Sequence, residues 1–150
     1  MDSMLRISDA AAIGLHAMVC LAQPNDGDPV SAVRMATDLH VSEAHLSKVL
    51  QRLGRRGLVI SKRGPGGGFV LGKPTDQVNL LEIYEAIEGP LPMGECLLGR
   101  SDCAFGDCVL GGLIQDVQSR IHDYFKSTTL ADLMARVGSG SAGQLVAGGE

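Results

Sequence analysis

The stretch that decides the fold runs from Val30 to Lys73 and reads VSAVRMATDLHVSEAHLSKVLQRLGRRGLVISKRGPGGGFVLGK. Its first half carries two helical patterns on either side of a short turn at His40 and Val41. Its second half carries two β-prone runs separated by a glycine-rich segment. Helix, turn, helix and a two-stranded ribbon make a winged helix-turn-helix. The stretch therefore predicts a mainly α fold with a small β-wing.

Serines mark the starts of both helices, because their side chains accept a hydrogen bond from the first turn. Ser31 begins the first helix, whose predicted inward positions are Val33, Met35, Ala36 and Leu39. Ser42 caps the second, which runs to about Arg55 and ends at Gly57. Its inward residues follow a helical repeat and are Leu46, Val49, Leu50 and Leu53. This second helix is the predicted recognition helix.

The predicted ribbon consists of residues 58–60 and 69–71, with a basic, glycine-rich tip at 61–68. That tip is too long for a two-residue hairpin turn. A phosphate-binding loop is the other glycine-rich possibility, but the segment lacks the Gly-Lys-Ser/Thr ending and does not lead into a helix. A flexible wing is the better interpretation.

Charge is segregated along the chain. Residues 42–73 hold seven basic residues and one acidic residue, whereas the rest holds six basic and sixteen acidic residues. The net charge of -4 thus hides a basic unit on an acidic body. Such segregation is typical of a nucleic-acid-binding face. Aromatic residues make up only 3% of the chain, which argues against single-strand binding by base stacking.

The predicted DNA contacts fall into three groups. The start of a recognition helix meets base edges in the major groove, and the candidates there are Ser42, Ala44, His45, Ser47 and Lys48. Basic residues further along suit phosphate contact, and these are Arg52, Arg55 and Arg56. At the wing, Arg63 suits a minor groove, and Gly66 and Gly67 allow the backbone to approach DNA closely.

Four further helices are predicted outside this stretch. The first is capped by Ser8 and runs to about Ala22, and the next runs from Asn79, paired with Glu82 in a capping box, to about Glu88. The longest covers about 109–127 with an apolar stripe, and the last begins at Thr128 or Thr129 and ends near Val137. Residues 1–137 are expected to form one domain, and the Gly- and Ser-rich residues 138–150 a disordered tail.

Length and composition narrow the classes of protein. A chain of 150 residues buries one core. It has no apolar run near the ~20 residues that a membrane span needs, and its first residues, MDSMLRISD, do not resemble a signal peptide. A cytoplasmic protein with no membrane partner is expected. No nucleophile and base stand at a recognisable spacing, so an enzyme is the least favoured class.

Three cysteines lie in one loop at about 93–108. Cys96, Cys103 and Cys108 are separated by six and four residues. Thiolates so spaced can converge on one metal centre, and soft ligands favour iron–sulfur clusters, zinc or copper(I). Unrelated or disulfide-forming thiols are the simpler alternative. Cys20 sits in the apolar first helix, where a buried small hydrophobe is expected.

The chain resembles the Rrf-two family of bacterial winged-helix regulators, which has IscR-like and NsrR-like members. The segments that carry the resemblance are VSEAHLSKVLQRLGRRGLV, RGPGGGFVLGKP, the three-cysteine loop and TTLADL at 128–133. It covers nearly all of Leu5 to Val137. The resemblance implies a homodimer joined chiefly through the long helix from Val109. It also implies that Cys96, Cys103 and Cys108 hold a [2Fe–2S] or [4Fe–4S] cluster whose state alters DNA affinity.

The fourth cluster ligand varies within that family. IscR-like members use a histidine three residues after the last cysteine, but Gly111 stands there in this chain. NsrR-like members use an aspartate at the start of the first helix, which reaches the other subunit's cluster, and Asp9 matches that place. Other members use a histidine further along the same helix, where His16 stands. The resemblance favours Asp9, with His16 as the alternative.

Taken together, these patterns predict a dimeric transcriptional regulator, a repressor, whose affinity for a double-stranded operator is controlled by an iron–sulfur cluster that senses redox state, nitric oxide or cluster supply. The main alternative is a cluster-free winged-helix regulator that senses oxidation of its thiols. A zinc-stabilised version and a scaffold for cluster assembly are the others.

Overall fold

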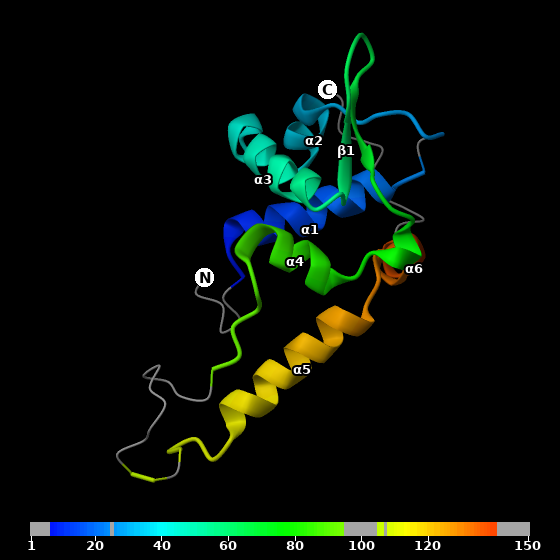
Figure 1. Ribbon diagram of the computed structural model, residues 1–150. Helices are drawn as coiled ribbons and strands as arrows, with labels where there is room; N and C mark the ends of the chain where they lie inside the picture. Colours follow the sequence, from blue (N-terminus) through cyan, green and yellow to red (C-terminus); the bar gives the residue numbers. More distant parts are fainter. Residues whose placement is uncertain (1–6, 25, 95–104, 107, 141–150) are drawn as a thin grey trace, which may run out of the picture.

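The computed structural model describes residues 7–24, 26–94, 105, 106 and 108–140. Residues 139 and 140 are described for their backbone only. Figure 1 shows a helical body from which a two-stranded wing projects at one end and one long helix at the other. The elements are α1 (Asp9–Ala22), α2 (Ala32–Asp38), α3 (Glu43–Arg55), β1 (Val59–Lys62), β2 (Gly68–Leu71), the 3-10 helix η1 (Thr75–Gln77), α4 (Leu80–Glu88), α5 (Leu113–Ser127) and α6 (Leu130–Gly140). The mainly α fold with a small wing is confirmed.

The predicted helix starts are confirmed by their hydrogen bonds. The hydroxyls of Ser8, Ser31 and Ser42 each accept from the backbone N–H three residues on. Asn79 and Glu82 form the full capping box of α4. Each bond satisfies an N–H that the helix itself leaves without an acceptor.

The turn between α2 and α3 is made by the backbone. His40 has a left-handed φ of 53°, its N–H donates to Thr37 O at 3.2 Å, and the N–H of Val41 donates to Ala36 O at 3.0 Å. These two bonds make a Schellman motif, which ends a helix and reverses the chain. The same pair of bonds ends α3 at Gly57, whose φ is 70°. The two turns set the angle at which α3 leaves the body.

The wing is an antiparallel pair in which Val59 lies opposite Leu71 and Lys62 opposite Gly68. Strand β1 begins one residue later than predicted and extends into the predicted tip, so the tip is shorter, at 63–67. Val30 forms an isolated antiparallel bridge to β2, since it exchanges both backbone hydrogen bonds with Phe69. The loop before α2 is thereby fixed to the wing.

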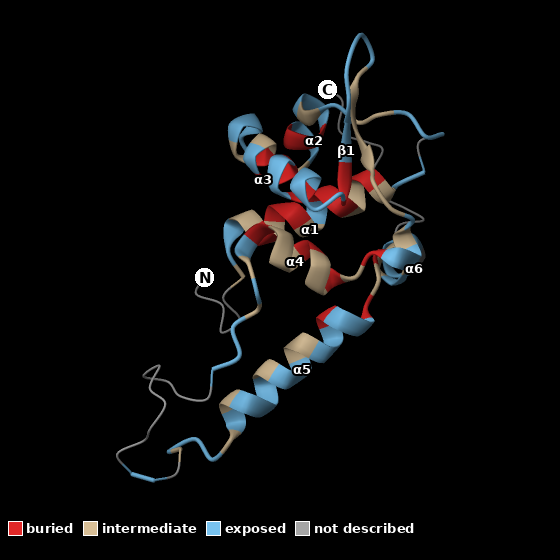
Figure 2. Cartoon of the chain, viewed as in Figure 1, coloured by how far each residue is buried: buried red, intermediate tan, exposed pale blue. Residues whose placement is uncertain are grey.

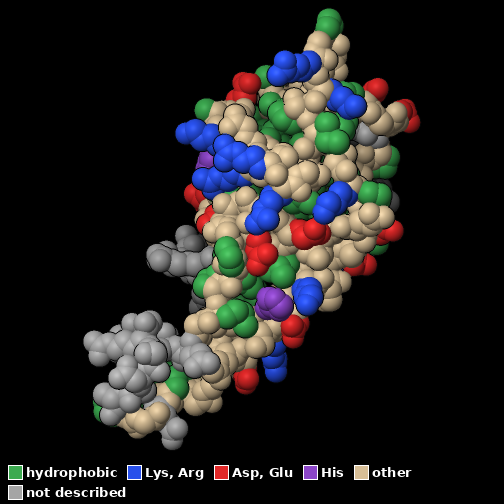
Figure 3. Space-filling view, in the orientation of Figure 1, with side chains coloured by type: hydrophobic (Ala, Val, Ile, Leu, Met, Phe, Trp, Pro, Cys, Tyr) green, Lys and Arg blue, Asp and Glu red, His purple; other side chains and the backbone are tan. Residues whose placement is uncertain are grey.

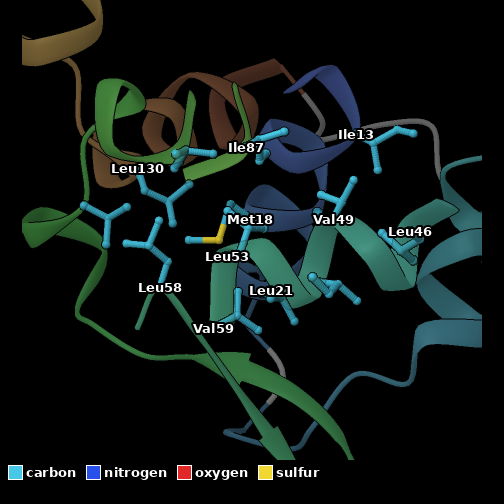
Figure 4. Packing of buried hydrophobic residues seen from close by; sticks show 14 of the residues in the cluster. Ile13, Met18, Leu21, Leu46, Val49, Leu53, Leu58, Val59, Ile87 and Leu130 are labelled. Atoms are coloured by element: carbon cyan, nitrogen blue, oxygen red, sulfur yellow. The ribbon is translucent and has the colours of Figure 1, made fainter. Parts of the chain in front are cut away.

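The core lies between α1, α3 and α4, and Figure 4 shows its side chains in contact. The four predicted inward residues of α3 are all buried. On α2 the prediction was partly wrong, because Val33 is 59% exposed whereas Met35 and Ala36 are buried. Successive helical residues turn by ~100°, so Val33 lies on nearly the opposite side of the helix from Met35.

Helix α5 differs from its prediction at its start. It begins at Leu113 and not at Val109, because Gly111 and Gly112 both have positive φ, which a right-handed helix excludes. It is still the longest of the described helices, at 15 residues. Of its predicted apolar stripe only Phe125 is buried; Leu113 and Val117 remain 54% and 45% exposed. Figure 2 shows the resulting exposed and half-buried surface along α5.

The chain's last helix also differs from its prediction. Thr129 caps it, with Asp132 accepting in return from the N–H of Thr129. The helix continues through Gly140, so residues 138–140, expected to be part of a disordered tail, are helical; residues 141–150 lie outside the described residues. None of the helices described is both long and apolar enough to cross a membrane.

Candidate nucleic-acid interface and metal ligands

The recognition helix α3 is divided lengthwise into a buried and an exposed face. Ala44, Lys48 and Gln51 are exposed, and His45 and Ser47 are half-buried. Ser42 stands just before the helix, and its hydroxyl accepts from the N–H of His45 at 3.2 Å. The predicted base-reading residues therefore lie together on and before the first turns of α3, with their side chains outside the core.

Basic side chains gather around this helix and the wing. Figure 3 shows Lys and Arg concentrated over the end of the molecule that holds α3 and the ribbon. Five of them are Lys48, Arg55, Arg56, Lys62 and Arg63, all exposed, and all but Lys62 were predicted from sequence as DNA contacts. None of the five forms an ion pair with an acidic residue of the described part of the chain. Their charge is therefore available to an anionic partner.

Arg52 is different from these five. Its Nη1 donates to the backbone carbonyl of Ile87 at 2.9 Å, across the junction between α3 and the end of α4. The sequence places Arg52 with the phosphate contacts. The structure adds an intramolecular bond that no sequence pattern indicated, since its partner is a backbone atom 35 residues away.

The wing tip is shaped by its glycines. Gly66 has a φ of 73° and open space around it. At Gly67 a Cβ would lie 2.5 Å from Lys62 O and 2.8 Å from Gly64 O, so only glycine fits this tight turn. The turn carries Arg63 at the exposed end of the ribbon. Backbone without side chains at this point leaves room for close approach to a ligand.

Helix α4 is bonded to its neighbours at both ends. At its start, Lys73 from the base of the wing pairs with Glu82 at 3.0 Å. At its end, the hydroxyl of Ser8 donates to Glu88, and the N–H of Leu91 donates to Oε1 of Glu85 at 3.3 Å. The chain that follows α4 continues towards Cys96. Sequence reasoning missed all three contacts, and only Pro90 hinted at an unusual helix end.

Beside the end of α4 is a small cavity of about 150 Å³. It lies between α4, α5 and the segment after α4, and is lined mainly by apolar side chains, among them Ile7, Leu91 and Ile121. Tyr84 and Phe125 also line it, with ring centroids 5.9 Å apart. Burial, followed by the nearby Glu88, raises the pKa of Tyr84. The cavity belongs to the apolar junction of α4 with α5.

The predicted metal ligands are only partly within the described residues. Cys96 and Cys103 lie outside them, whereas Cys108 is half-buried and precedes the turn into α5. Asp9 and His16 are both exposed on α1. They are seven residues apart, which places them on one side of the helix. Within the described residues, no three His, Cys, Asp or Glu side chains form a metal-binding group.

Two local features bear on which of these side chains can act as a ligand. Nδ1 of His16 lies 2.7 Å from the carbonyl of Ala12, which can only accept, so Nδ1 carries a proton, and in the neutral ring the lone pair is then on Nε2. Asp9 has no hydrogen bond or ion pair with any other described residue. Both side chains thus expose to solvent an atom that is able to coordinate a metal: a carboxylate oxygen of Asp9 and Nε2 of a neutral His16.

Cys20 is set apart from the other cysteines. It is half-buried on α1 and packs against the core. Burial is the main reason that its pKa is raised, and the Asp38 charge adds to the effect. Because a raised pKa keeps a thiol neutral and unreactive, the placement agrees with a packing role.

Comparisons with known proteins agree with this geometry. The sequence model of the Rrf2 (Rrf-two) family, described as an iron-dependent transcriptional regulator, matches residues 7–136. An HTH-type transcriptional regulator of Haemophilus influenzae is 32% identical over 131 residues, which is 87% of each chain. Among solved structures, the chain is similar to T. potens IscR, with a TM-score of 0.75 and 27% identity over 94% of each chain. It is also similar to CymR, described as the global cysteine regulator of B. subtilis, with a TM-score of 0.73 and 28% identity over 89% of this chain and 98% of that one.

The family match spans the recognition helix, the wing and α5, and the solved relatives share the whole arrangement. The chain therefore belongs to the Rrf-two family of winged-helix transcriptional regulators, which bind DNA and are not enzymes.

Proposed function

We propose that the chain is a homodimeric, cytoplasmic repressor whose affinity for operator DNA is set by an iron–sulfur cluster. The observation that carries the proposal is the pairing of two features in one short chain. One is a basic, unpaired DNA-reading face on α3 and the wing. The other is a segment with Cys96, Cys103 and Cys108 between α4 and α5.

On the DNA side, residues of α3 have separate tasks. Ala44, Ser47 and Lys48 stand on the outer face and read base edges together with Ser42 and His45. Arg55 and Arg56, near the end of the helix, contact phosphates and fix the register. Arg63 enters the minor groove from the wing, where Gly66 and Gly67 let the backbone approach.

The dimer forms through α5. Its exposed apolar side chains Leu113 and Val117, with Leu110 just before them, make a surface that water does not favour. Burying it against a second copy removes that surface. A two-fold dimer also brings two recognition helices to one side, about one DNA turn (~34 Å) apart, which suits a palindromic operator. Replacing Val117 by Glu is expected to give a monomer in sedimentation velocity that binds the palindromic operator no tighter than a single half-site.

The three thiolates and one ligand from α1 would hold the cluster. Thiolates are the ligands that iron–sulfur clusters prefer, and such clusters supply a redox- and nitric-oxide-sensitive centre. Asp9 offers an unpaired carboxylate for the fourth position. His16 offers Nε2, with its Nδ1–H bonded to a carbonyl as metal-binding histidines commonly are. Asp9 stays the first choice, because it matches the family position at the start of the first helix.

Control of DNA affinity then follows from geometry. A ligand on α1 of one subunit would tie that helix to the cysteine segment of the other subunit, and loss of the cluster would release that tie. A small change in the angle between the two subunits breaks the match to a spacing of ~34 Å. The cluster-bound and the cluster-free protein would each favour a different angle between the two subunits. The cluster would thus bias an equilibrium between a dimer that matches the operator spacing and one that does not.

A second candidate is a cluster-free regulator that senses thiol oxidation. The likeness to a protein described as a global cysteine regulator favours it. Oxidation of two of the three cysteines of the loop would then replace the cluster as the signal. Cys20 is not part of that pair, because its raised pKa suppresses the thiolate.

The deciding experiment is anaerobic purification followed by visible absorption, iron and sulfide analysis, and operator binding before and after nitric oxide or oxygen. The expected result is a coloured protein with acid-labile sulfide whose operator affinity changes as the colour bleaches. The triple variant Cys96→Ser, Cys103→Ser, Cys108→Ser should be colourless and unresponsive. A colourless, iron-free protein that responds to a disulfide-forming oxidant would favour thiol sensing, and one with zinc and no response would favour a structural metal.

A further inference from the structure

Helix α4 connects both DNA-reading elements. Its first turn holds the base of the wing through the 3.0 Å pair between Lys73 and Glu82. Its last turn holds the recognition helix through the 2.9 Å bond from Arg52 to Ile87 O. Helix α4 has nine residues and makes one of these contacts at each end. Helix α4 is thus in direct contact with the wing at its start and with α3 at its end.

The bond from Arg52 has a specific cause in the sequence. A carbonyl in the last turn of a helix lacks the usual partner four residues on. After Ile87, Pro90 has no N–H, and the N–H of Leu91 donates instead to the Glu85 side chain. The guanidinium of Arg52 supplies the donor, and its positive charge suits the negative end of the helix dipole.

Two further segments meet at the same helix end. The cap of α1 bonds there, since the Ser8 hydroxyl donates to Glu88. The segment after α4 bonds there too, through Leu91 and Glu85. The first of these contacts stands next to Asp9, and the second starts the stretch that continues to Cys96. The recognition helix is thus tied to the two places from which the proposed cluster ligands come.

We propose that Arg52 is a positioning residue, which holds α3 to the end of α4 and carries displacements of that junction to the DNA-reading face. It acts through Ile87 and not through a phosphate. This inference rests on the proposed function for the signal that moves the junction, while the positioning role itself needs only DNA binding. Arg55 provides the matched contrast, because it lies one turn further along α3 and has no partner among the described residues.

The first arm of the test is the salt dependence of DNA binding. A duplex selected from random sequence by the wild-type protein is titrated with wild type, Arg52→Gln, Arg52→Lys and Arg55→Gln at several salt concentrations. Arg52→Gln should lower discrimination between that duplex and random DNA about tenfold, the cost of one charged hydrogen bond, and leave the salt slope unchanged. Arg55→Gln should weaken both DNAs and reduce the slope by about one.

Arg52→Lys serves as the conservative variant, since an ammonium can still donate to Ile87 O. It should recover part of the discrimination. Because it keeps the donor, it also keeps the test decisive if Arg52→Gln fails to fold. A slope reduced equally in the Arg52 and Arg55 variants would assign Arg52 to a phosphate and overturn the proposal.

The second arm compares operator affinity of the cluster-loaded protein with that of the same protein after iron chelation. In wild type the two affinities should differ. In Arg52→Gln their ratio should move towards one, while Arg55→Gln should keep the wild-type ratio because it weakens both forms alike. An unchanged ratio in Arg52→Gln would overturn the transmission role. Equal affinities in wild type would instead refute cluster sensing, and the salt arm would still decide how Arg52 acts.

Discussion

Nζ of Lys73 lies 3.0 Å from Oε1 of Glu82, and this ion pair joins the base of the wing to the first turn of α4. Both side chains are 38% exposed, so solvent screens the attraction and the pair contributes less than about 1 kcal/mol. Glu82 also accepts from the N–H of Asn79 at 3.2 Å, which completes the capping box. One carboxylate thus serves the helix and the wing.

These two roles of Glu82 can be separated. Glu82→Gln keeps an oxygen for the capping box but loses the charge, so the free energy of unfolding should fall by a few tenths of a kcal/mol. Glu82→Ala loses both and should cost about 1 kcal/mol. Urea denaturation measures both values. Adding Lys73→Met to Glu82→Gln should lower the free energy of unfolding by almost nothing more, because the ion pair is already lost. Equal losses for Glu82→Gln and Glu82→Ala would show that the capping bond contributes nothing.

The turn at His40 should be improved by glycine. His40 holds a φ of 53°, which costs an L-residue roughly 1 kcal/mol. His40→Gly should therefore raise the free energy of unfolding by several tenths of a kcal/mol, after the extra entropy of glycine in the unfolded chain. His40→Val, with a β-branched side chain, should lower it by more than 1 kcal/mol. In thermal melts the midpoint temperature should be highest for His40→Gly, lower for the wild type and lowest for His40→Val. Any other order would contradict a strained turn at His40.

Gly72 is a position where even one methyl group does not fit. A Cβ there would lie 2.1 Å from the backbone oxygen of Gly57, which is itself fixed by the end of α3. Gly72→Ala should cost about 2 kcal/mol or more of stability, because backbone has to shift. Gly54→Ala is the control, since its Cβ would lie 3.6 Å from Val59 O and alanine suits a helix better. Chemical denaturation should show loss in the first variant and a gain in the second.

The thiol of Cys20 should react slowly in the folded protein. Its pKa is raised above the ordinary 9.0 by burial and then by Asp38, so the thiolate is scarce at neutral pH. Iodoacetamide labelling followed by peptide mass spectrometry should give a rate–pH midpoint that is higher in the folded protein than in urea. Stability from the neutral thiol is present below the unfolded pKa and is lost as pH rises through the folded pKa. A folded midpoint below the midpoint in urea would show an activated cysteine instead.

Local signals explain how much of the fold was predictable. Ser8, Ser31, Ser42 and Asn79 were identified as caps because each acts on an N–H three residues away. The buried side of α3 followed from its spacing alone. Predictions failed where the deciding fact was not periodic. The two glycines before Leu113 delay α5, and the short α2 leaves Val33 outside.

Contacts between distant segments were beyond the reach of sequence patterns. Val30 pairs with Phe69 through an isolated bridge. One residue is too short for the alternation of apolar and polar side chains by which a strand is recognised in a sequence. Arg52 was predicted to contact phosphate from its charge and position, but its bond to Ile87 O depends on how α4 ends. The exposed positions of α3 and of the wing tip followed from the sequence because they lie on one helix and one turn, and their contacts with DNA stay a prediction. The metal ligands Cys96 and Cys103 lie outside the described residues and remain a prediction from spacing and resemblance.

The lengthwise division of α3 has a consequence for how such a protein changes its target. Stability draws on the buried side, Leu46 to Leu53, and on turns made by backbone atoms. Ala44, Lys48 and Gln51 on the outer side contribute almost nothing to it. Those positions can be randomised, in evolution or in a library, without unfolding the scaffold. Under the proposed assignment of base contacts, single substitutions at Ala44 or Lys48 are expected to change the operator preference of a protein that still folds.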